Sequence, residues 1–361
     1  MSVRVVVPEG YDDPHLPSGG NTYDRALVAG LVAARRPATA HPVAGSWPRP
    51  TARDLAGLRA VLAGVPDGAQ VVVDGLVASS AAPVLVPECR RLRVTVLVHM
   101  ALGRPGGPPG TRADAPVTRQ ERAVLAAARA VVTTSAWSRR HLLTLHGLPG
   151  SHVAVARPGV DPAPLARPSP HGRRLLCVGA LVPAKGHDVL LGALTRLTDL
   201  DWDLVCVGSR DRDPAWAAWL EGRVRRLGLG GRVHLVGVRT GAELAATYGA
   251  SDLQVLATRR ETYAMVLTES LACGVPVVAS AVGGVPEAVG HVADGERPGG
   301  LVAPDDPDAL AGALRRWLEE PRLRATLRSR AAERRLTLPG WESTVRAVIG
   351  VLDTPPGWVA A

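Results

Sequence analysis

Two glutamates and the single lysine of the chain are the residues best suited to hold a charged ligand rich in hydroxyl groups. Glu261 follows an apolar run of strand length, and Glu269 falls near the first turns of the next helical segment. Such carboxylates accept hydrogen bonds from sugar or ribose hydroxyls. Lys185 lies between an apolar run and a helical segment, and its compact ammonium suits a diphosphate. Spacing alone leaves an alternative open, a surface pair of glutamates and a lysine without a special role.

A glycine pair marks a second place where a ligand could approach the backbone. Gly19 and Gly20 follow the first apolar run and precede a helical segment, and the only asparagine of the chain, Asn21, is adjacent. The N-terminus of a helix offers free N–H groups to an anion. A simple capping turn made by Ser18 or Asn21 explains the same residues. No G-x-G-x-x-G follows the first strand, which argues against a dinucleotide-dependent dehydrogenase.

The elements that would position these residues alternate between strands and helices. Continuous Val and Leu runs are typical of strands covered on both faces, so the pattern predicts an α/β protein with doubly wound parallel sheets. Nine strands are expected, at Val3–Val7, Val71–Val73, Val94–Val98, Val131–Thr133, Leu175–Val178, Leu204–Val207, Val233–Val236, Leu253–Leu256 and Val277–Ala279. Helices are expected at Tyr23–Ala34, Arg119–Ala130, Asp188–Leu197, Ala215–Leu227, Ala242–Tyr248, Val266–Ala272, Arg322–Arg335 and Gly340–Leu352.

So many strands favour two sheets, and a Pro-rich stretch at 157–172 is typical of a linker between two domains. We expect an N-terminal domain over residues 1–165 and a C-terminal domain over 166–338. The last helix and tail, residues 339–361, are expected to return to the first domain. Pro- and Gly-rich runs at 103–110 and 297–300 are interpreted as loops.

Composition excludes several classes of protein. Hydrophobic residues make up 46% and charged residues 21% of the 361 residues, which is ordinary globular usage. No apolar stretch is long enough for a membrane span, and the N-terminus lacks a secretory pattern, so we expect a cytoplasmic protein. The four cysteines are far apart and show no spacing typical of metal ligands. The net charge of +9 leaves a peripheral membrane contact open, but scattered basic residues and 3% aromatics argue against nucleic acid.

The run from Glu261 to Glu287 resembles the donor-site signature of the family-4 retaining glycosyltransferases, which have the GT-B fold. In that signature an E-x7-E motif precedes a small-Gly-x-Pro-Val-Val strand and a Gly-Gly-x-Pro-Glu turn, and all three are present in order. Further segments resemble the family at residues 18–20, 98–100, 134–138, 158–161 and 179–186. The resemblance implies two Rossmann-like domains that face each other across an interdomain cleft.

The resemblance also implies a reaction, the transfer of a hexose-type sugar from a nucleoside diphosphate sugar to a hydroxyl acceptor with retention of anomeric configuration. UDP or GDP is the expected nucleotide, and the nucleotide sugar is a co-substrate rather than a cofactor. No metal is expected at the site. The acceptor would be a small molecule or a lipid. An epimerase or phosphorylase of the same fold, a non-catalytic nucleotide-sugar binder, and a membrane scaffold are the alternatives.

Donor-binding roles carry over by position. Glu269 would hold the ribose hydroxyls, Glu261 would contact the transferred sugar, and Lys185 would neutralise charge on the leaving diphosphate. Backbone N–H groups along the sugar and diphosphate would come from Thr262, Tyr263, Ala264, Met265 and Val266. Gly179 would belong to the same donor site, beside the turn that carries Lys185.

The first domain would contribute fewer groups. His99, at the end of a strand, would approach the sugar, and it joins Lys185 and Glu261 as the residues expected to act in catalysis. Gly19 and Gly20, with Asn21, would approach the diphosphate or the acceptor.

The chain departs from the family pattern at three positions. Ala180 stands where the family has an Arg that pairs with the lysine, and Thr262 and Ala264 stand where it has Gly. Half of the cationic clamp is therefore missing, with Arg239, Arg259 and Arg260 as candidate substitutes.

Overall fold

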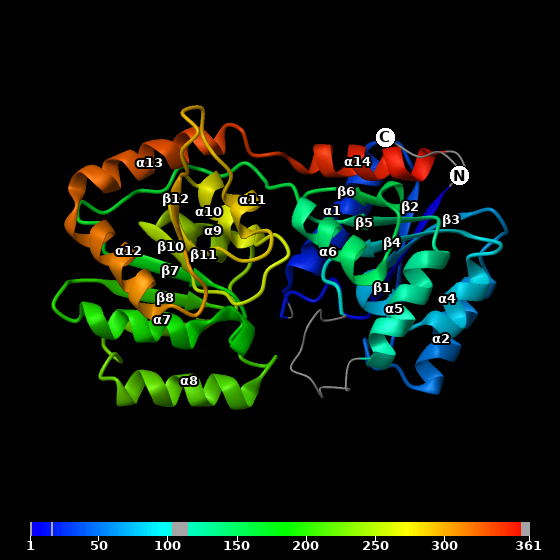
Figure 1. Cartoon of the computed structure of the whole chain (residues 1–361), viewed down its shortest axis with the longest axis horizontal. Coiled ribbons are helices and arrows are strands. Elements are labelled where there is room, and N and C mark those ends of the chain that lie inside the picture. Colours follow the sequence, from blue (N-terminus) through cyan, green and yellow to red (C-terminus); the bar gives the residue numbers. More distant parts are fainter. Residues whose placement is uncertain (1, 16, 103–114, 355–361) are drawn as a thin grey trace. The chain divides into compact units, whose positions relative to one another are not determined.

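The computed structural model describes residues 2–15, 17–102 and 115–354, and it divides into two compact units. Unit 1 comprises Met1–Gly159 and Trp341–Ala361, and unit 2 comprises Val160–Gly340. Each unit contains one parallel sheet of six strands covered by helices (Figure 1). The fold class predicted from the alternating pattern, α/β with doubly wound sheets, is confirmed.

The sheet of unit 1 has the strand order β2-β1-β3-β4-β5-β6. Its strands are β1 (Val3–Pro8), β2 (Ala38–Val43), β3 (Gln70–Asp74), β4 (Arg93–Val98), β5 (Ala130–Thr133) and β6 (Val153–Val155). Its helices are α1 (Gly19–Ala33), α2 (Ala52–Ala63), α3 (Gly75–Ala78), α4 (Ala82–Glu88), α5 (Ala115–Ala127), α6 (Ala136–His146) and α14 (Trp341–Asp353). The order reverses between β1 and β3, so connections leave the sheet on opposite sides there.

Two apolar layers cover this sheet. One lies against α2, α4, α5 and α6, and the other lies against α1 and α14. The last helix is held to α1 so closely that a Cβ added at Gly30 would lie 2.3 Å from a methyl group of Val345. Gln70 also donates a hydrogen bond of 2.7 Å to the carbonyl of Leu352. Continuous valine in β1 and β3 suits strands that are buried on both faces.

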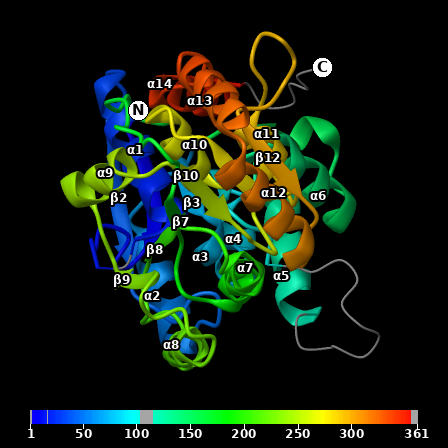
Figure 2. The same cartoon turned by 90° about the vertical axis from the view of Figure 1, so that its left-hand side faces the viewer.

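The sheet of unit 2 has the order β12-β11-β10-β7-β8-β9, the doubly wound Rossmann arrangement. Its strands are β7 (Arg174–Val178), β8 (Asp203–Val207), β9 (Val233–Gly237), β10 (Leu253–Leu256), β11 (Val277–Ser280) and β12 (Gly299–Val302). Its helices are α7 (His187–Leu194), α8 (Pro214–Arg226), α9 (Gly241–Gly249), α10 (Met265–Ala272), α11 (Val285–Val289), α12 (Pro307–Glu319) and α13 (Pro321–Arg335). In Figure 2 unit 2 is seen end-on, with α7 and α12 on one side of its strands.

All nine expected strands are confirmed, but three edge strands were missed. The strands β2, β6 and β12 lie at sheet edges and lack the continuous Val/Leu runs of the central strands. The interpretation of residues 297–300 as a loop is wrong for Gly299 and Gly300, which pair with β11, whereas Arg297 and Pro298 precede the strand. A Cβ at Gly299 would lie 2.0 Å from the carbonyl oxygen of Val277, so glycine is needed for that pairing. The expected loop at 103–110 lies outside the described residues.

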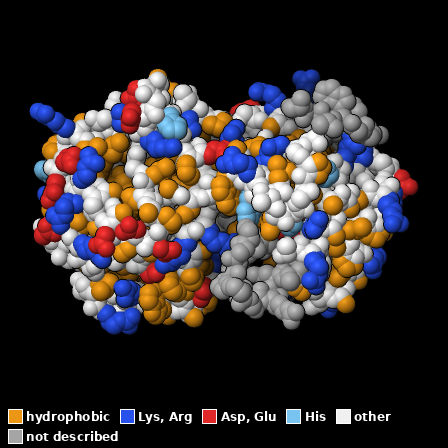
Figure 3. All heavy atoms as spheres, in the orientation of Figure 1, with side chains coloured by type: hydrophobic (Ala, Val, Ile, Leu, Met, Phe, Trp, Pro, Cys, Tyr) orange, Lys and Arg blue, Asp and Glu red, His pale blue; other side chains and the backbone are white. Residues whose placement is uncertain are grey.

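Two properties bear on contact with a membrane: how the basic side chains are distributed on the surface, and whether a helix could cross a bilayer. On the face drawn in Figure 3, basic side chains are scattered rather than gathered into one patch. Within the described part of the chain, no helix combines the length and the apolar character needed to cross a membrane.

Candidate functional site

The switch point of the unit 2 sheet lies between β7 and β10, and two of the sequence-predicted residues follow these strands. Ligands of open α/β sheets bind outside the carboxyl ends of the strands at such a point. The Nζ of Lys185, after β7, forms an ion pair with Oε1 of Glu261, after β10. Their side chains are 27% and 11% exposed. Each of these charges is therefore accessible but already has a partner.

The turn that carries Lys185 is fixed to the loop after β10 by backbone contacts. It is a single turn of 3-10 helix, η3 (Pro183–Lys185), followed by Gly186 with φ +65°. A Cβ at Gly186 would lie 1.9 Å from the carbonyl oxygen of Ala257, so only glycine fits. The hydroxyl of Thr258 donates a hydrogen bond of 3.0 Å to the carbonyl of Ala184.

The loop that carries Glu261 packs in the same way against the glycine pair of the motif. A Cβ at Gly283, which has φ +55°, would lie 1.7 Å from the carbonyl oxygen of Glu261. A Cβ at Gly284 would lie 2.1 Å from the carbonyl oxygen of Thr262. The Gly-Gly turn thus packs directly against the backbone of the Glu261 loop. This close contact explains why the motif has glycine at both positions.

The loop ends in a strained residue at the start of α10. Ala264 has φ +73° and ψ +64°, a left-handed conformation that costs a residue with a Cβ about 1–2 kcal/mol. Helix α10 has no side-chain cap, so the N–H groups at Met265 and Val266 belong to an uncapped helix N-terminus. Such a terminus favours an anion. Tyr263 is buried beside it.

Glu269 lies on α10 and is held by a residue that sequence analysis missed. The hydroxyl of Tyr248, on α9, donates a hydrogen bond of 2.8 Å to Oε2 of Glu269. Among the described residues, no hydrogen bond to Oε1 is found. Burial raises the pKa of Glu269, with a smaller contribution of the same sign from Asp161 and an opposing one from Tyr248. One carboxylate oxygen thus remains for a ligand hydroxyl.

The three arginines considered as substitutes for the missing cation differ in their partners. Arg259 donates to both carboxylate oxygens of Asp188, at 2.8 and 2.7 Å, and contacts Asp305 at 2.6 Å. Arg239 donates to Thr247 and forms an ion pair with a neighbouring glutamate on α9. The exposed guanidinium of Arg260 has no partner within the described part of the chain.

Gly179 lies directly after β7, under the side chain of Lys185. A Cβ at Gly179 would lie 3.5 Å from Cδ of the lysine, which is ordinary contact. The close contact in this region is with the residue that follows β8: a Cβ at Gly208 would lie 2.0 Å from the carbonyl oxygen of Gly179. The carboxyl ends of β7 and β8 therefore meet with almost no space between their backbones.

In unit 1 the glycine pair opens α1 beside its own switch point. Ser18 caps the helix by accepting a hydrogen bond of 3.0 Å from the N–H of Asn21. The Asn21 side chain donates to the carbonyl of Gly10 at 3.5 Å, so it ties the helix start to the loop after β1. Gly20 lies against His99, where an added Cβ would be 3.1 Å from the ring. Gly19 is the first residue of the helix.

His99, after β4, belongs to a buried cluster with two aspartates, here called the Asp–His cluster (Asp24, Asp74 and His99). Its Nε2 lies 2.9 Å from Oδ1 of Asp24 and 3.4 Å from Oδ2 of Asp74. Burial and, next, the charge of Asp24 raise the pKa of Asp74 to about 7. Burial lowers the pKa of His99, but the two aspartates outweigh it and the net shift is upward. Asp74 and His99 therefore both favour their protonated forms more strongly than the free side chains do.

Sequence analysis singled out His99 but not its partners. Asp24 lies four residues after Gly20 on α1, so that both share one helix face, and this spacing was the available signal. Asp74 ends β3 and also caps α3 by accepting from the N–H of Leu76 at 2.7 Å. Such a turn after a strand explains its position without a ligand, so the sequence alone does not single this residue out.

Two groups of side chains among the described residues have three potential metal-ligand atoms within 4.8 Å of one another. One is the Asp–His cluster of unit 1. The other consists of Cys177, His187 and Cys206, all buried in unit 2. Carboxylate oxygens suit hard cations, whereas thiolates and imidazole suit soft ones.

Comparisons with solved structures define the class of fold. Sucrose-phosphate synthase from Thermosynechococcus elongatus superposes with a TM-score of 0.77 at 22% identity, covering 97% of this chain and 98% of that one. HepE from Anabaena, in complex with UDP-glucose, superposes with a TM-score of 0.77 at 19% identity, covering 98% and 99%. The fold is therefore the GT-B fold of the glycosyltransferases.

The family comparison is narrower and falls on unit 2. Residues 168–334 match the family described as Glycosyl transferases group 1, which places this segment in that family. A D-inositol 3-phosphate glycosyltransferase from Kineococcus radiotolerans is 34% identical over 260 residues, or 65% of this chain and 59% of the relative. One from Jonesia denitrificans is 30% identical over 289 residues, or 74% and 66%. The alignments thus span less than two thirds of either bacterial relative.

Proposed function

We propose that this chain is a glycosyltransferase that moves a sugar from a nucleoside diphosphate sugar to a hydroxyl acceptor with retention of anomeric configuration. The observation that carries this proposal is the arrangement at the switch point of unit 2. There Lys185 and Glu261 meet, and Glu269 lies on the helix that the Glu261 loop opens. A cation, two carboxylates and an uncapped helix N-terminus match a diphosphate flanked by two polyols.

Each group has a role that its chemistry supports. The accepting oxygen of Glu269 would bind ribose, while Tyr248 holds the other oxygen and orients the carboxylate. Glu261 would accept from hydroxyls of the transferred sugar. The diphosphate would then draw Lys185 from Glu261, and the first N–H groups of α10 would share its charge. Placed donors of this kind stabilise charge that develops as the bond to the diphosphate breaks.

In the proposed transfer, the bond between the anomeric carbon and the diphosphate oxygen breaks and the bond to the acceptor oxygen forms on the same face. The acceptor proton passes to the departing phosphate, so no protein nucleophile is needed. Lys185 balances the negative charge that this phosphate gains. His99, whose imidazole is fixed by Asp24, would approach the sugar hydroxyls as a hydrogen-bonding group.

UDP is the nucleotide to test first, because the structurally similar HepE was solved with UDP-glucose. The relatives named as D-inositol 3-phosphate glycosyltransferases make a phosphorylated polyol the first acceptor to test.

The donor part of the proposal is tested by thermal unfolding with UDP, GDP and ADP, each measured against the same protein without ligand. At about 100 times its dissociation constant, a ligand of the native state adds about 2.7 kcal/mol of stability. We expect one nucleotide to raise Tm, and Lys185→Ala and Glu269→Gln to remove that increase. Glu319→Gln, on the exposed face of α12, is the matched control and should keep it. No increase with any nucleotide would contradict the donor site.

The stereochemical part needs a separate measurement. Incubation with the stabilising nucleotide's glucose derivative and an inositol phosphate should give a product whose anomeric proton coupling, read by NMR, matches that of the donor. An inverted product would refute retention while leaving transferase activity intact. Turnover that requires free phosphate instead of a hydroxyl acceptor would favour a phosphorylase.

A further inference from the structure

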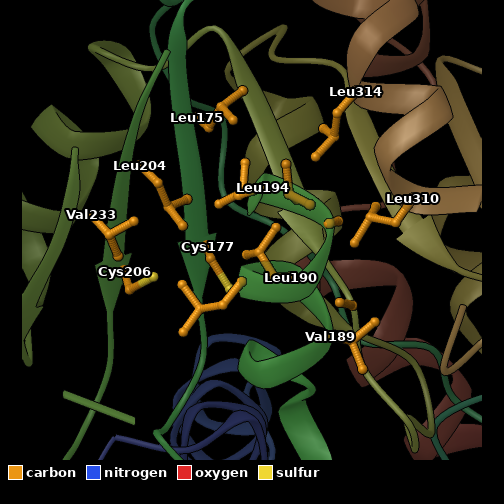
Figure 4. Close-up of a cluster of buried hydrophobic side chains, with 14 of the residues drawn as sticks. Leu175, Cys177, Val189, Leu190, Leu194, Leu204, Cys206, Val233, Leu310 and Leu314 are labelled. Atoms are coloured by element: carbon orange, nitrogen blue, oxygen red, sulfur yellow. The ribbon is translucent and has the colours of Figure 1, made fainter. Parts of the chain in front are cut away.

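Three residues far apart in the sequence meet beneath the turn that carries Lys185. Cys177 on β7 and Cys206 on β8 are in register on neighbouring strands, so their side chains emerge on the same face of the sheet. His187 is the first residue of α7, which packs on that face. Figure 4 shows the two thiols side by side among the apolar side chains of this layer.

The imidazole of His187 lacks the hydrogen bonds that a buried polar group requires. His187 is 2% exposed, and neither ring nitrogen has a hydrogen-bond partner within the described part of the chain. Leaving such a group unsatisfied costs about 1–3 kcal/mol, and native structures contain few of them. A nitrogen of this ring and the two sulfurs lie within 4.8 Å of one another.

The cysteines are equally enclosed, at 1% and 3% exposure. A thiolate is the form of cysteine that binds metals. The pocket therefore offers two thiols in register and an imidazole whose nitrogens have no hydrogen-bond partner among the described residues.

We propose that Cys177, His187 and Cys206 form a binding site for a soft divalent metal ion of the Zn²⁺ type. Two sulfurs and one imidazole nitrogen are a donor set that zinc prefers, and the ion would supply the partner that the ring lacks. On binding, the thiols that are still protonated would release their protons to solvent. A disulfide between the cysteines would leave the imidazole unsatisfied, so it explains less of what is observed.

The consequence of such a site is mechanical rather than catalytic. The ion would join β7, β8 and the start of α7, and His187 is two residues beyond Lys185. It would therefore fix the end of the turn whose lysine pairs with Glu261. Intervals of 10 and 19 residues between the three ligands follow no short metal-binding motif, and only the sheet topology brings them together.

The test uses the untagged full chain, reduced, treated with a chelator and then titrated with Co²⁺ and with Zn²⁺. We expect one equivalent of Co²⁺ to bind with a near-ultraviolet thiolate-to-cobalt charge-transfer band, and Zn²⁺ to abolish the band and raise Tm. Cys206→Ser and His187→Ala should each weaken binding by more than about 100-fold, the upper limit for losing a mere supporting contact. Cys89→Ser makes the same substitution outside the group and should leave binding unchanged.

Several results would overturn the proposal. Absence of the charge-transfer band in the reduced wild-type protein does so even if the variants fail to fold. Equal binding by wild type and Cys206→Ser places the metal elsewhere. Mass spectrometry that finds Cys177 and Cys206 joined in a disulfide, in protein purified without reductant and able to bind nucleotide, would assign the pair to a structural crosslink instead.

Discussion

The two units place polar groups at the switch points of their sheets in different ways. In unit 2 opposite charges pair, as Lys185 does with Glu261, and backbone packing around glycines fixes the loops that carry them. In unit 1 the Asp–His cluster brings two carboxylates and one imidazole together from α1, β3 and the end of β4, and all three are largely buried. One site is held by steric fit of the main chain, and the other by contacts among the side chains of two aspartates and a histidine.

This difference predicts that the two sites fail under different perturbations. A methyl group added at the glycines that pack against the site loops of unit 2 should destabilise the fold severely, because a main-chain carbonyl cannot move aside. At the unit 1 site the close approaches are milder: a Cβ at Gly20 would meet the His99 side chain at 3.1 Å, and a Cβ at Gly75 would meet the carbonyl oxygen of Leu97 at 3.0 Å. A change of pH should act mainly on unit 1, where a carboxyl has a pKa of about 7.

Gly283→Ala is the strongest test of steric control in unit 2. The added methyl would overlap the carbonyl oxygen of Glu261 at a position with positive φ, so we expect a loss of roughly 3–5 kcal/mol and of nucleotide-induced stabilisation. Denaturant unfolding measures the loss. Gly312→Ala, at an open position in α12, is the control and should stabilise by up to about 1 kcal/mol. Similar changes in the free energy of unfolding for the two variants would contradict steric control of the unit 2 site.

The second largest expected effect is a change in the pH dependence of stability when Asp74 is substituted. Because its pKa is raised in the folded protein, folding takes up a proton, and stability should fall as pH rises from about 4 towards 7. The raised pKa of His99 acts with the same sign, but only above its ordinary pKa of 6.5. We expect Asp74→Asn to remove roughly 2–4 kcal/mol of that fall, measured by urea unfolding across this range.

The control for this prediction is Asp67→Asn, which changes an exposed carboxylate paired with Arg91. It should leave the slope of stability against pH close to that of wild type. If Asp74→Asn retained the full wild-type slope, the proton of the cluster would lie elsewhere, on Asp24 or on groups outside it.

The same contrast explains what the sequence could predict. The unit 2 residues form contiguous motifs, since Glu261, Glu269 and the glycine pair all fall in the one stretch between β10 and α11. The central strands were found because burial on both faces demands continuous apolar runs. Edge strands do not need continuous apolar runs. In β12, for example, two of the four residues are glycine.

Groups assembled by topology left no local pattern. Asp24 and Asp74 are 50 positions apart and meet only because β1 and β3 are neighbours. Tyr248 reaches Glu269 from α9, and nothing in the spacing of a tyrosine and a glutamate predicts that contact. Such pairs become visible only when the strand order is known.

Tyr248→Phe probes the side-chain support that unit 2 adds to its backbone packing. Removing the hydroxyl takes one donor from Oε2 of Glu269, and a hydrogen bond to a charged group is worth about 1.5–3 kcal/mol. We expect nucleotide affinity to fall about tenfold or more by calorimetry, with the stability of the free protein changed less. Tyr11→Phe, in unit 1, is the matched control. Unchanged affinity would mean that the Glu269 carboxylate needs no orienting partner.

The smallest expected effect measures the free-energy cost of the left-handed conformation of Ala264. Glycine adopts its left-handed conformation without the Cβ penalty, so Ala264→Gly should raise stability by up to about 1 kcal/mol, although glycine also costs entropy on folding. Ala245→Gly, at an exposed position inside α9, should lower stability by about 1 kcal/mol. Opposite signs for one and the same substitution can come only from backbone conformation. Equal losses at both positions would mean that the loop after Glu261 relaxes out of the left-handed region, and steric control of unit 2 would then end at the glycine pair.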